Sequence, residues 1–109
     1  MNQSTTPMGV TFGSLGVLGP NAVTRVAKNA QDLGYRSFWT VEATSTDAFT
    51  LLGSVSAVAP EMDLATGIIP IQLRAPTLTA MSAATLQALS PGADVWLGIG
   101  VSAPGILRQ

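Results

Sequence analysis

Four short apolar runs recur at nearly equal intervals, and this spacing constrains the fold more than any other feature. They read GVTFGSL, SFWTVEA, DLATGIIPI and DVWLGIGV, and they begin at Gly9, Ser37, Asp63 and Asp94, which are 28, 26 and 31 residues apart. Each gap carries apolar residues at helical spacing. Strands that alternate with single helices form parallel sheets joined by right-handed crossovers. The sequence therefore predicts an α/β fold in the order βαβαβαβ.

The three helical gaps have recognisable ends. In the first, Asn21 is a candidate N-cap and Gly34 a candidate stop. In the second, Asp47 can cap a helix that ends at Pro60. In the third, Pro76 suits the first helical turn. The residues that share one face of this third helix are Leu78, Met81, Thr85 and Leu89.

Chain length leaves two architectures open. A doubly wound sheet can be complete in about four or five strands, whereas a TIM barrel of eight βα units needs about 250 residues. The 109 residues would supply only half of such a barrel. We treat residues 1–109 as a single domain, and length alone favours the doubly wound sheet.

Composition excludes several function classes. The chain is 47% apolar, has a formal net charge of −1, and contains neither Cys nor His. It has no basic block for nucleic acid, no usual zinc ligand and no histidine to activate a serine. The first residues, MNQSTTPMGV, do not have the pattern of a secretory signal, and no apolar stretch approaches the ~20 residues of a membrane span. We expect a cytoplasmic protein without metal, nucleic-acid or membrane partners.

Glu42 is the main candidate for chemistry because it lies near the carboxyl end of the second strand. Parallel α/β sheets bind ligands at this end. Strand alternation places Phe38, Thr40 and Glu42 on one face, and Trp39, Val41 and Ala43 on the other. Glu42 could accept a hydrogen bond from a ligand or act as an acid or base. A solvated acid at the start of a loop fits the pattern equally well.

Glycines and prolines mark the ends of the last two strands. Gly67 and Pro70 predict a bulge or strained peptide in the third strand, directed at the ligand face. Gly98 and Gly100, with Ala103, match a dinucleotide-binding spacing, but too few residues follow for its helix. These glycines can instead let the backbone approach either a flat ligand or a neighbouring strand.

Arg74 precedes the third helix and could bind an anion there. The pattern favours a solvated surface arginine.

Taken together, four motifs resemble the N-terminal half of the luciferase-like monooxygenase family, in the branch that uses coenzyme F420. They are LGY leading into FW and Glu42, DAFTLL, TGIIPI followed by RAPTLTAMSAATL, and LGIGVS after a Ser-Pro-Gly turn. The resemblance implies a TIM (β/α)8 barrel, here a half-barrel of about four strands and three helices. It also implies hydride transfer between a small-molecule substrate and F420, with FMN as the alternative. It overrides the length argument.

The resemblance also implies the residues of the site. Glu42 would be the catalytic residue. The residues implied to contact the cofactor are Phe12, Gly13, Thr40, Glu42, Gly67, Ile68, Ile69, Gly98, Gly100, Val101 and Ser102. In deazaflavin enzymes the bulge at Gly67 and Ile68 commonly holds a non-proline cis peptide behind the ring.

Several positions depart from the family pattern. Ala43 stands where relatives often have His, Pro91 to Asp94 replace a Gly-Gly-Arg turn, and Ala103 falls where some members place an acid. The family holds the cofactor phosphates mainly with the other half of the barrel. The alternative is therefore a non-catalytic half-barrel that self-associates or binds a partner chain, and we expect either a homo-oligomer or a missing C-terminal half.

Overall fold

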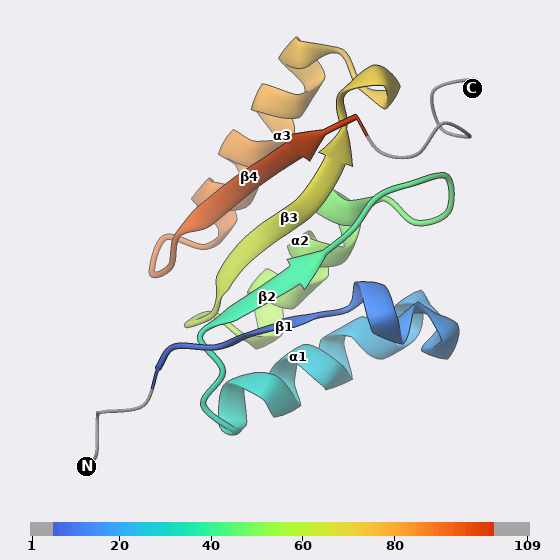
Figure 1. The fold of residues 1–109 in the computed structure, drawn as a ribbon. Coiled ribbons are helices and arrows are strands. Elements are labelled where there is room, and N and C mark those ends of the chain that lie inside the picture. Colours follow the sequence, from blue (N-terminus) through green and yellow to red (C-terminus); the bar gives the residue numbers. More distant parts are fainter. Residues whose placement is uncertain (1–5, 102–109) are drawn as a thin grey trace.

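The computed structural model describes residues 6–101, which form one parallel sheet covered on one face by helices (Figure 1). The strands are β1 (Gly9–Thr11), β2 (Ser37–Thr40), β3 (Asp63–Pro70) and β4 (Val95–Gly100). The helices are α1 (Val23–Asp32), α2 (Ala48–Val58) and α3 (Pro76–Leu89). Short 3-10 turns lie at Gly13–Leu18, Pro20–Ala22 and Ile71–Leu73. The predicted α/β class and the alternation of strands and helices are confirmed.

The strand order separates the two architectures that length left open. The sheet runs β1-β2-β3-β4, and every pair is parallel. A doubly wound sheet reverses its strand order to place helices on both faces, whereas here α1, α2 and α3 lie on the same side (Figure 1). Length alone therefore favoured the wrong architecture, and this arrangement is that of consecutive units of a TIM barrel.

The first strand is shorter than the run GVTFGSL predicts. It ends at Thr11, and Phe12 already has helical backbone angles, with φ −80° and ψ −10°. The glycines that follow favour a turn, and the Leu15 N–H donates to the Phe12 carbonyl at 2.9 Å. The predicted strand over Gly9–Leu15 is therefore wrong beyond Thr11.

The predicted helix ends are mostly confirmed. The Asp47 side chain accepts a hydrogen bond from the Thr50 N–H at 3.1 Å, as an N-cap should. Gly34 follows α1 with φ +94°, the left-handed conformation of a helix stop. Asn21 is not an N-cap, because it lies in the preceding 3-10 turn and α1 begins at Val23.

The core lies between the sheet and its helices. Phe38 and Leu64 from the strands pack with Leu52 and Val55 of α2, and all four are fully buried. In α3, by contrast, the buried residue is Leu86. The predicted α3 face does not cover the sheet: Leu78, Met81, Thr85 and Leu89 are exposed and line a groove beside α2.

The opposite face of the sheet carries exposed aromatic and aliphatic side chains. Trp39 and Trp96 lie at equivalent register positions on either side of Ala65. Trp39 is 36% exposed, and Trp96 and Ile99 are 58% and 57% exposed. Within residues 6–101 no helix covers this open face (Figure 1), and no helix there is long and apolar enough to cross a membrane.

Candidate functional site

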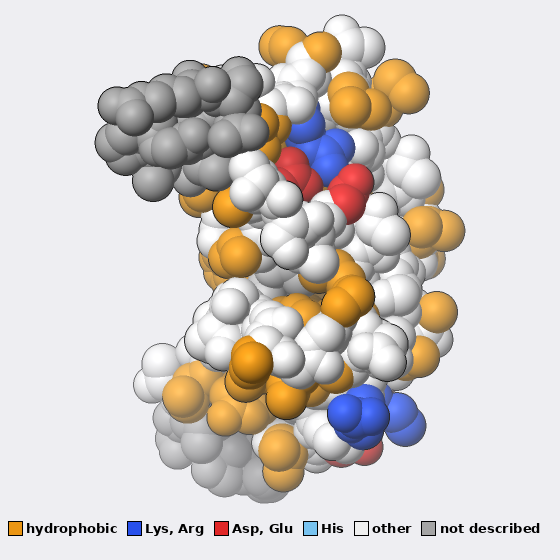
Figure 2. Space-filling view, turned by 90° about the vertical axis from the view of Figure 1, so that its right-hand side faces the viewer, with side chains coloured by type: hydrophobic (Ala, Val, Ile, Leu, Met, Phe, Trp, Pro, Cys, Tyr) orange, Lys and Arg blue, Asp and Glu red, His pale blue; other side chains and the backbone are white. Residues whose placement is uncertain are grey.

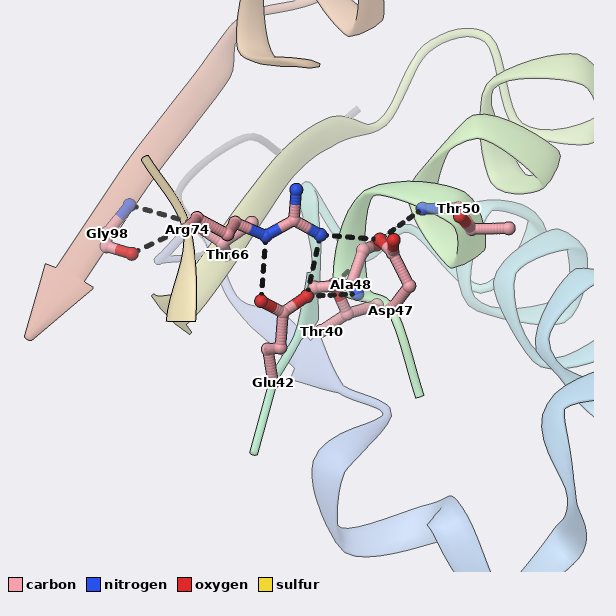
Figure 3. Close-up of polar contacts among 8 residues, drawn as sticks. All are labelled: Thr40, Glu42, Asp47, Ala48, Thr50, Thr66, Arg74 and Gly98. Atoms are coloured by element: carbon pink, nitrogen blue, oxygen red, sulfur yellow. Dashed lines mark hydrogen bonds and ion pairs between the residues drawn. The ribbon is translucent and has the colours of Figure 1, made fainter. Parts of the chain in front are cut away.

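An ion-pair cluster connects the carboxyl ends of β2 and β3 to the start of α2 (Figure 3). Arg74 binds Glu42 through two parallel hydrogen bonds, from Nε to Oε2 at 2.8 Å and from Nη2 to Oε1 at 2.9 Å. The same Nη2 lies 2.9 Å from Asp47 Oδ1. The Ala48 N–H also donates to Glu42 Oε1 at 3.0 Å. We call Glu42, Asp47 and Arg74 the rim cluster.

The inner pair of the rim cluster is nearly buried. The side chains of Glu42 and Arg74 are 9% and 10% exposed, whereas that of Asp47 is 51% exposed. The guanidinium also lies over the Phe49 ring, 5.1 Å from its centroid. The hydrogen bond to Glu42, helped by the charges of both carboxylates, raises the pKa of Arg74 despite its partial desolvation. The prediction of a solvated surface arginine was therefore wrong.

Glu42 is not a solvated loop acid either. Its carboxylate is directed at Arg74 and the first turn of α2 (Figure 3), on the face that strand alternation assigns to Phe38 and Thr40. In space-filling view, acidic side chains adjoin a cationic one on a mostly uncharged surface (Figure 2). The Glu42 carboxylate is therefore held in place by Arg74 and the start of α2. A direct role of Glu42 in catalysis stays a prediction.

The predicted bulge in β3 is confirmed. The register with β4 shifts between Thr66 and Ile69, and the Gly67–Ile68 peptide bond is cis. The backbone N–H of Glu42 donates to the Ile68 carbonyl at 3.2 Å. The bulge is thus joined to the residue that Arg74 holds.

The close packing of β3 against β4 explains why residue 98 is a glycine. The Thr66 hydroxyl donates to the Gly98 carbonyl and accepts from the Gly98 N–H, both at 3.0 Å. A Cβ at Gly98 would collide with the Thr66 carbonyl oxygen. Of the two explanations for this glycine, close approach of a neighbouring strand is therefore realised in the structure.

The residues predicted to bind cofactor fall into two groups. Phe12, Thr40 and Ile69 have buried side chains, with Phe12 packed near Phe38 and the Thr40 hydroxyl donating to the Ala48 carbonyl at 3.1 Å. The partly or fully exposed residues are Gly13, Gly67, Ile68, Gly98, Gly100 and Val101. Ser102 lies outside the described residues.

Trp39 is a candidate that the sequence reasoning did not select. Its indole Nε1 donates to Ser37 Oγ at 2.9 Å, and the ring packs along the open face so that a Cβ on Gly67 would meet Trp39 Cε3 at 2.9 Å. Val41 is also exposed next to it. Strand alternation had placed both residues on the face opposite Glu42, and this was the signal that could have identified them.

The described residues fit the ring of a flavin or deazaflavin better than its charged tail. Glycine backbone at the bulge and the exposed Trp39 offer an uncharged surface at the strand ends. Phe12, Gly13 and Val41 help to line a cavity of about 210 Å³ nearby, smaller than the roughly 300–1,000 Å³ of typical ligand pockets.

Phosphates would need cations, and Arg74, the cation of the rim cluster, is already paired with two carboxylates. Residues 6–101 contain no group of three or more acidic side chains that could hold a metal ion.

Comparisons with known proteins agree with this architecture. A Mycobacterium tuberculosis protein provisionally named a coenzyme F420-dependent oxidoreductase is 34% identical over 101 residues, which are 93% of this chain and 29% of that relative. The solved structure of coenzyme F420-dependent tetrahydromethanopterin reductase from Methanopyrus kandleri aligns with a TM-score of 0.77 at 19% identity, over 98% of this chain and 30% of that one.

Monooxygenase RslO1 from Streptomyces bottropensis aligns with a TM-score of 0.82 at 24% identity, over 94% of this chain and 36% of that one. The chain thus spans about a third or less of these proteins, and the two structures support the fold alone. The luciferase-like monooxygenase family matches residues 4–107, nearly the whole sequence. This chain belongs to the luciferase-like monooxygenase family.

Proposed function

We propose that the chain is part of a cytoplasmic oxidoreductase that transfers hydride between a small-molecule substrate and coenzyme F420, with FMN as the alternative cofactor. The observation that carries the proposal is the 34% identity to a relative named for F420, over 93% of this chain. The exposed strand ends beside the β3 bulge support it, because active sites of TIM barrels lie at this end. The chain covers 29% of that relative, so the proposal concerns the activity of a complete barrel.

In this proposal the chain's residues position the cofactor ring. When bound, the cofactor would supply the hydride chemistry itself. Gly67 and Ile68 would lie behind the ring, while Gly13, Gly98, Gly100 and Val101 would border it at the strand ends. Phe12, Thr40 and Ile69 have buried side chains, so they would support the residues that contact the ring and would not contact it themselves.

Titration with F420 and with FMN tests the proposal. The chain has two tryptophans, and Trp39 is the one that packs on Gly67. We expect cofactor binding to quench Trp39 emission and to shift the cofactor's absorbance. Matched Trp39→Phe and Trp96→Phe variants assign the quenching, which should persist only where Trp39 remains. If neither cofactor changes emission or absorbance, the proposal fails for this chain.

A second candidate is a non-catalytic half-barrel that associates through its open face, with another copy or with a partner chain. It is favoured by the exposure of Trp96 and Ile99 on β4, a strand that pairs only with β3 within the described residues. Closing such a sheet removes both edges and covers this apolar surface. Sedimentation velocity without cofactor should then show a dimer or larger species, and a stable monomer would contradict it.

A further inference from the structure

We infer that Arg74 is a positioning residue, which fixes the β3 bulge through Glu42. The rim cluster brings three segments together: the exit of β2, the first turn of α2 and the segment that follows β3. Arg74 contacts all three, because it comes from the last segment and binds acids on the other two. This role rests on the proposed function, in which the bulge lies behind the cofactor ring.

The first step concerns what Glu42 is able to do. A carboxylate offers about four acceptor positions, and Arg74 and Ala48 already use three of them. A carboxylate held in this way stabilises the arginine and the helix start. We therefore assign Glu42 to anchoring, in place of the acid or base role that its position in the sequence suggested.

The second step connects the anchor to the site. The Glu42 side chain and the Glu42 backbone N–H are attached to the same Cα, and this N–H donates to the Ile68 carbonyl at 3.2 Å. On the other side of the bulge, Gly67 packs against Trp39. A shift of the Glu42 side chain is therefore transmitted to the peptide carbonyl of the bulge, while Trp39 limits how far Gly67 can follow.

The third step explains why the residue is arginine. Two parallel bonds to Glu42, a third to Asp47 and the contact with Phe49 need a planar guanidinium. A lysine keeps the charge and much of the aliphatic stem but cannot form the paired bonds. Arg74→Lys therefore tests geometry separately from charge.

Amide hydrogen exchange on the full chain gives a readout that is independent of activity. In Arg74→Lys we expect the Glu42 amide to exchange about tenfold faster relative to the Leu64 amide, which bonds to Asp94 at the far end of β3. General destabilisation would accelerate both amides equally. Two control variants should leave the ratio of the two exchange rates unchanged. Asp47→Asn keeps an N-cap acceptor and the bonds between Arg74 and Glu42. Arg25→Gln changes an exposed arginine of α1.

Cofactor titration of the same variants separates this inference from the proposed function. We expect Arg74→Lys to weaken binding of F420 or FMN by about tenfold, because the bulge behind the ring would no longer be held in place. If the ratio of the Glu42 to the Leu64 amide exchange rate is unchanged in Arg74→Lys, the inference is overturned, whether or not cofactor binds. A changed ratio in a chain that binds neither cofactor supports the anchoring and rejects the proposed function. If Arg74→Lys does not fold, an unequal response of the two amides in Asp47→Asn overturns the route through Glu42.

Discussion

The two faces of this sheet differ in what covers them and in how their side chains are stabilised. On the helix-covered side, the charged groups of Glu42 and Arg74 are nearly buried and hydrogen-bonded to one another, and the apolar side chains of the strands pack under helices. On the open side, Trp39, Trp96 and Ile99 remain exposed. The comparison teaches that ionic side chains can stabilise the frame of a site, while uncharged surface is left for a flat ligand or another chain.

Removing the rim pair should have the largest effect on stability. In Arg74→Met, Glu42 would stay largely buried without its cation, and we expect the free energy of unfolding to fall by about 3 kcal/mol. Adding Glu42→Gln removes the unpaired charge and keeps an acceptor for Ala48, so the double variant should recover part of the loss. Urea unfolding measures both; a loss no larger than that of Arg25→Met would contradict the comparison.

Crowding the junction between β3 and β4 should have the next largest effect. In Gly98→Ala the new methyl group meets the Thr66 carbonyl oxygen, and backbone cannot move aside as a flexible side chain can. We expect a loss of about 2 kcal/mol, measured by urea unfolding. Gly53→Ala is the control, because a Cβ there meets nothing within 4 Å and α2 gains a better helix former. Equal losses in the two variants would show that the strand contact is unimportant.

Loss of the helix cap should cost less. Asp47→Ala removes the acceptor for the Thr50 N–H and the outer partner of Arg74, and about 1 kcal/mol is expected from the cap. Asp47→Asn should restore most of it, since asparagine caps helices as well and the exposed ion pair contributes little. Thermal unfolding of both variants measures the two losses of stability. Equal losses in Asp47→Ala and Asp47→Asn would show that the charge of Asp47 matters and its capping oxygen does not.

Changes on the open face should affect stability least. For Trp96→Gln, an exposed residue, we expect a change within about 0.5 kcal/mol. Its sedimentation separates the two candidate functions: association through the open face predicts a shift toward monomer. A large loss of stability would show that Trp96 is buried in solution, and would contradict the description of this face as exposed.

Much of the frame could be predicted from local pattern. The strand and helix order, the Asp47 cap, the Gly34 stop and the β3 bulge each depend on a few neighbouring residues, and the structure has all of them. The end of β1 was missed because strand-forming residues there are interrupted by glycines that favour turns.

The rim cluster depends on distance in space, which local pattern does not give. Glu42 and Arg74 are far apart in sequence and meet only because parallel strands end at the same edge. Without the register of β2 and β3, Arg74 was read as an isolated cation. The exposure of the Leu78 face had a similar cause, since helical spacing shows which residues share a face but not what covers it.

The sequential strand order has a consequence for how the chain reaches this structure. Each strand pairs with the one synthesised immediately before it, as Ser37 does with Gly9 and Val95 with Leu64. Every loop that must close spans a single βα unit, so its entropic cost stays similar along the chain. Such a sheet can grow strand by strand from its amino end during translation, without waiting for distant segments to arrive.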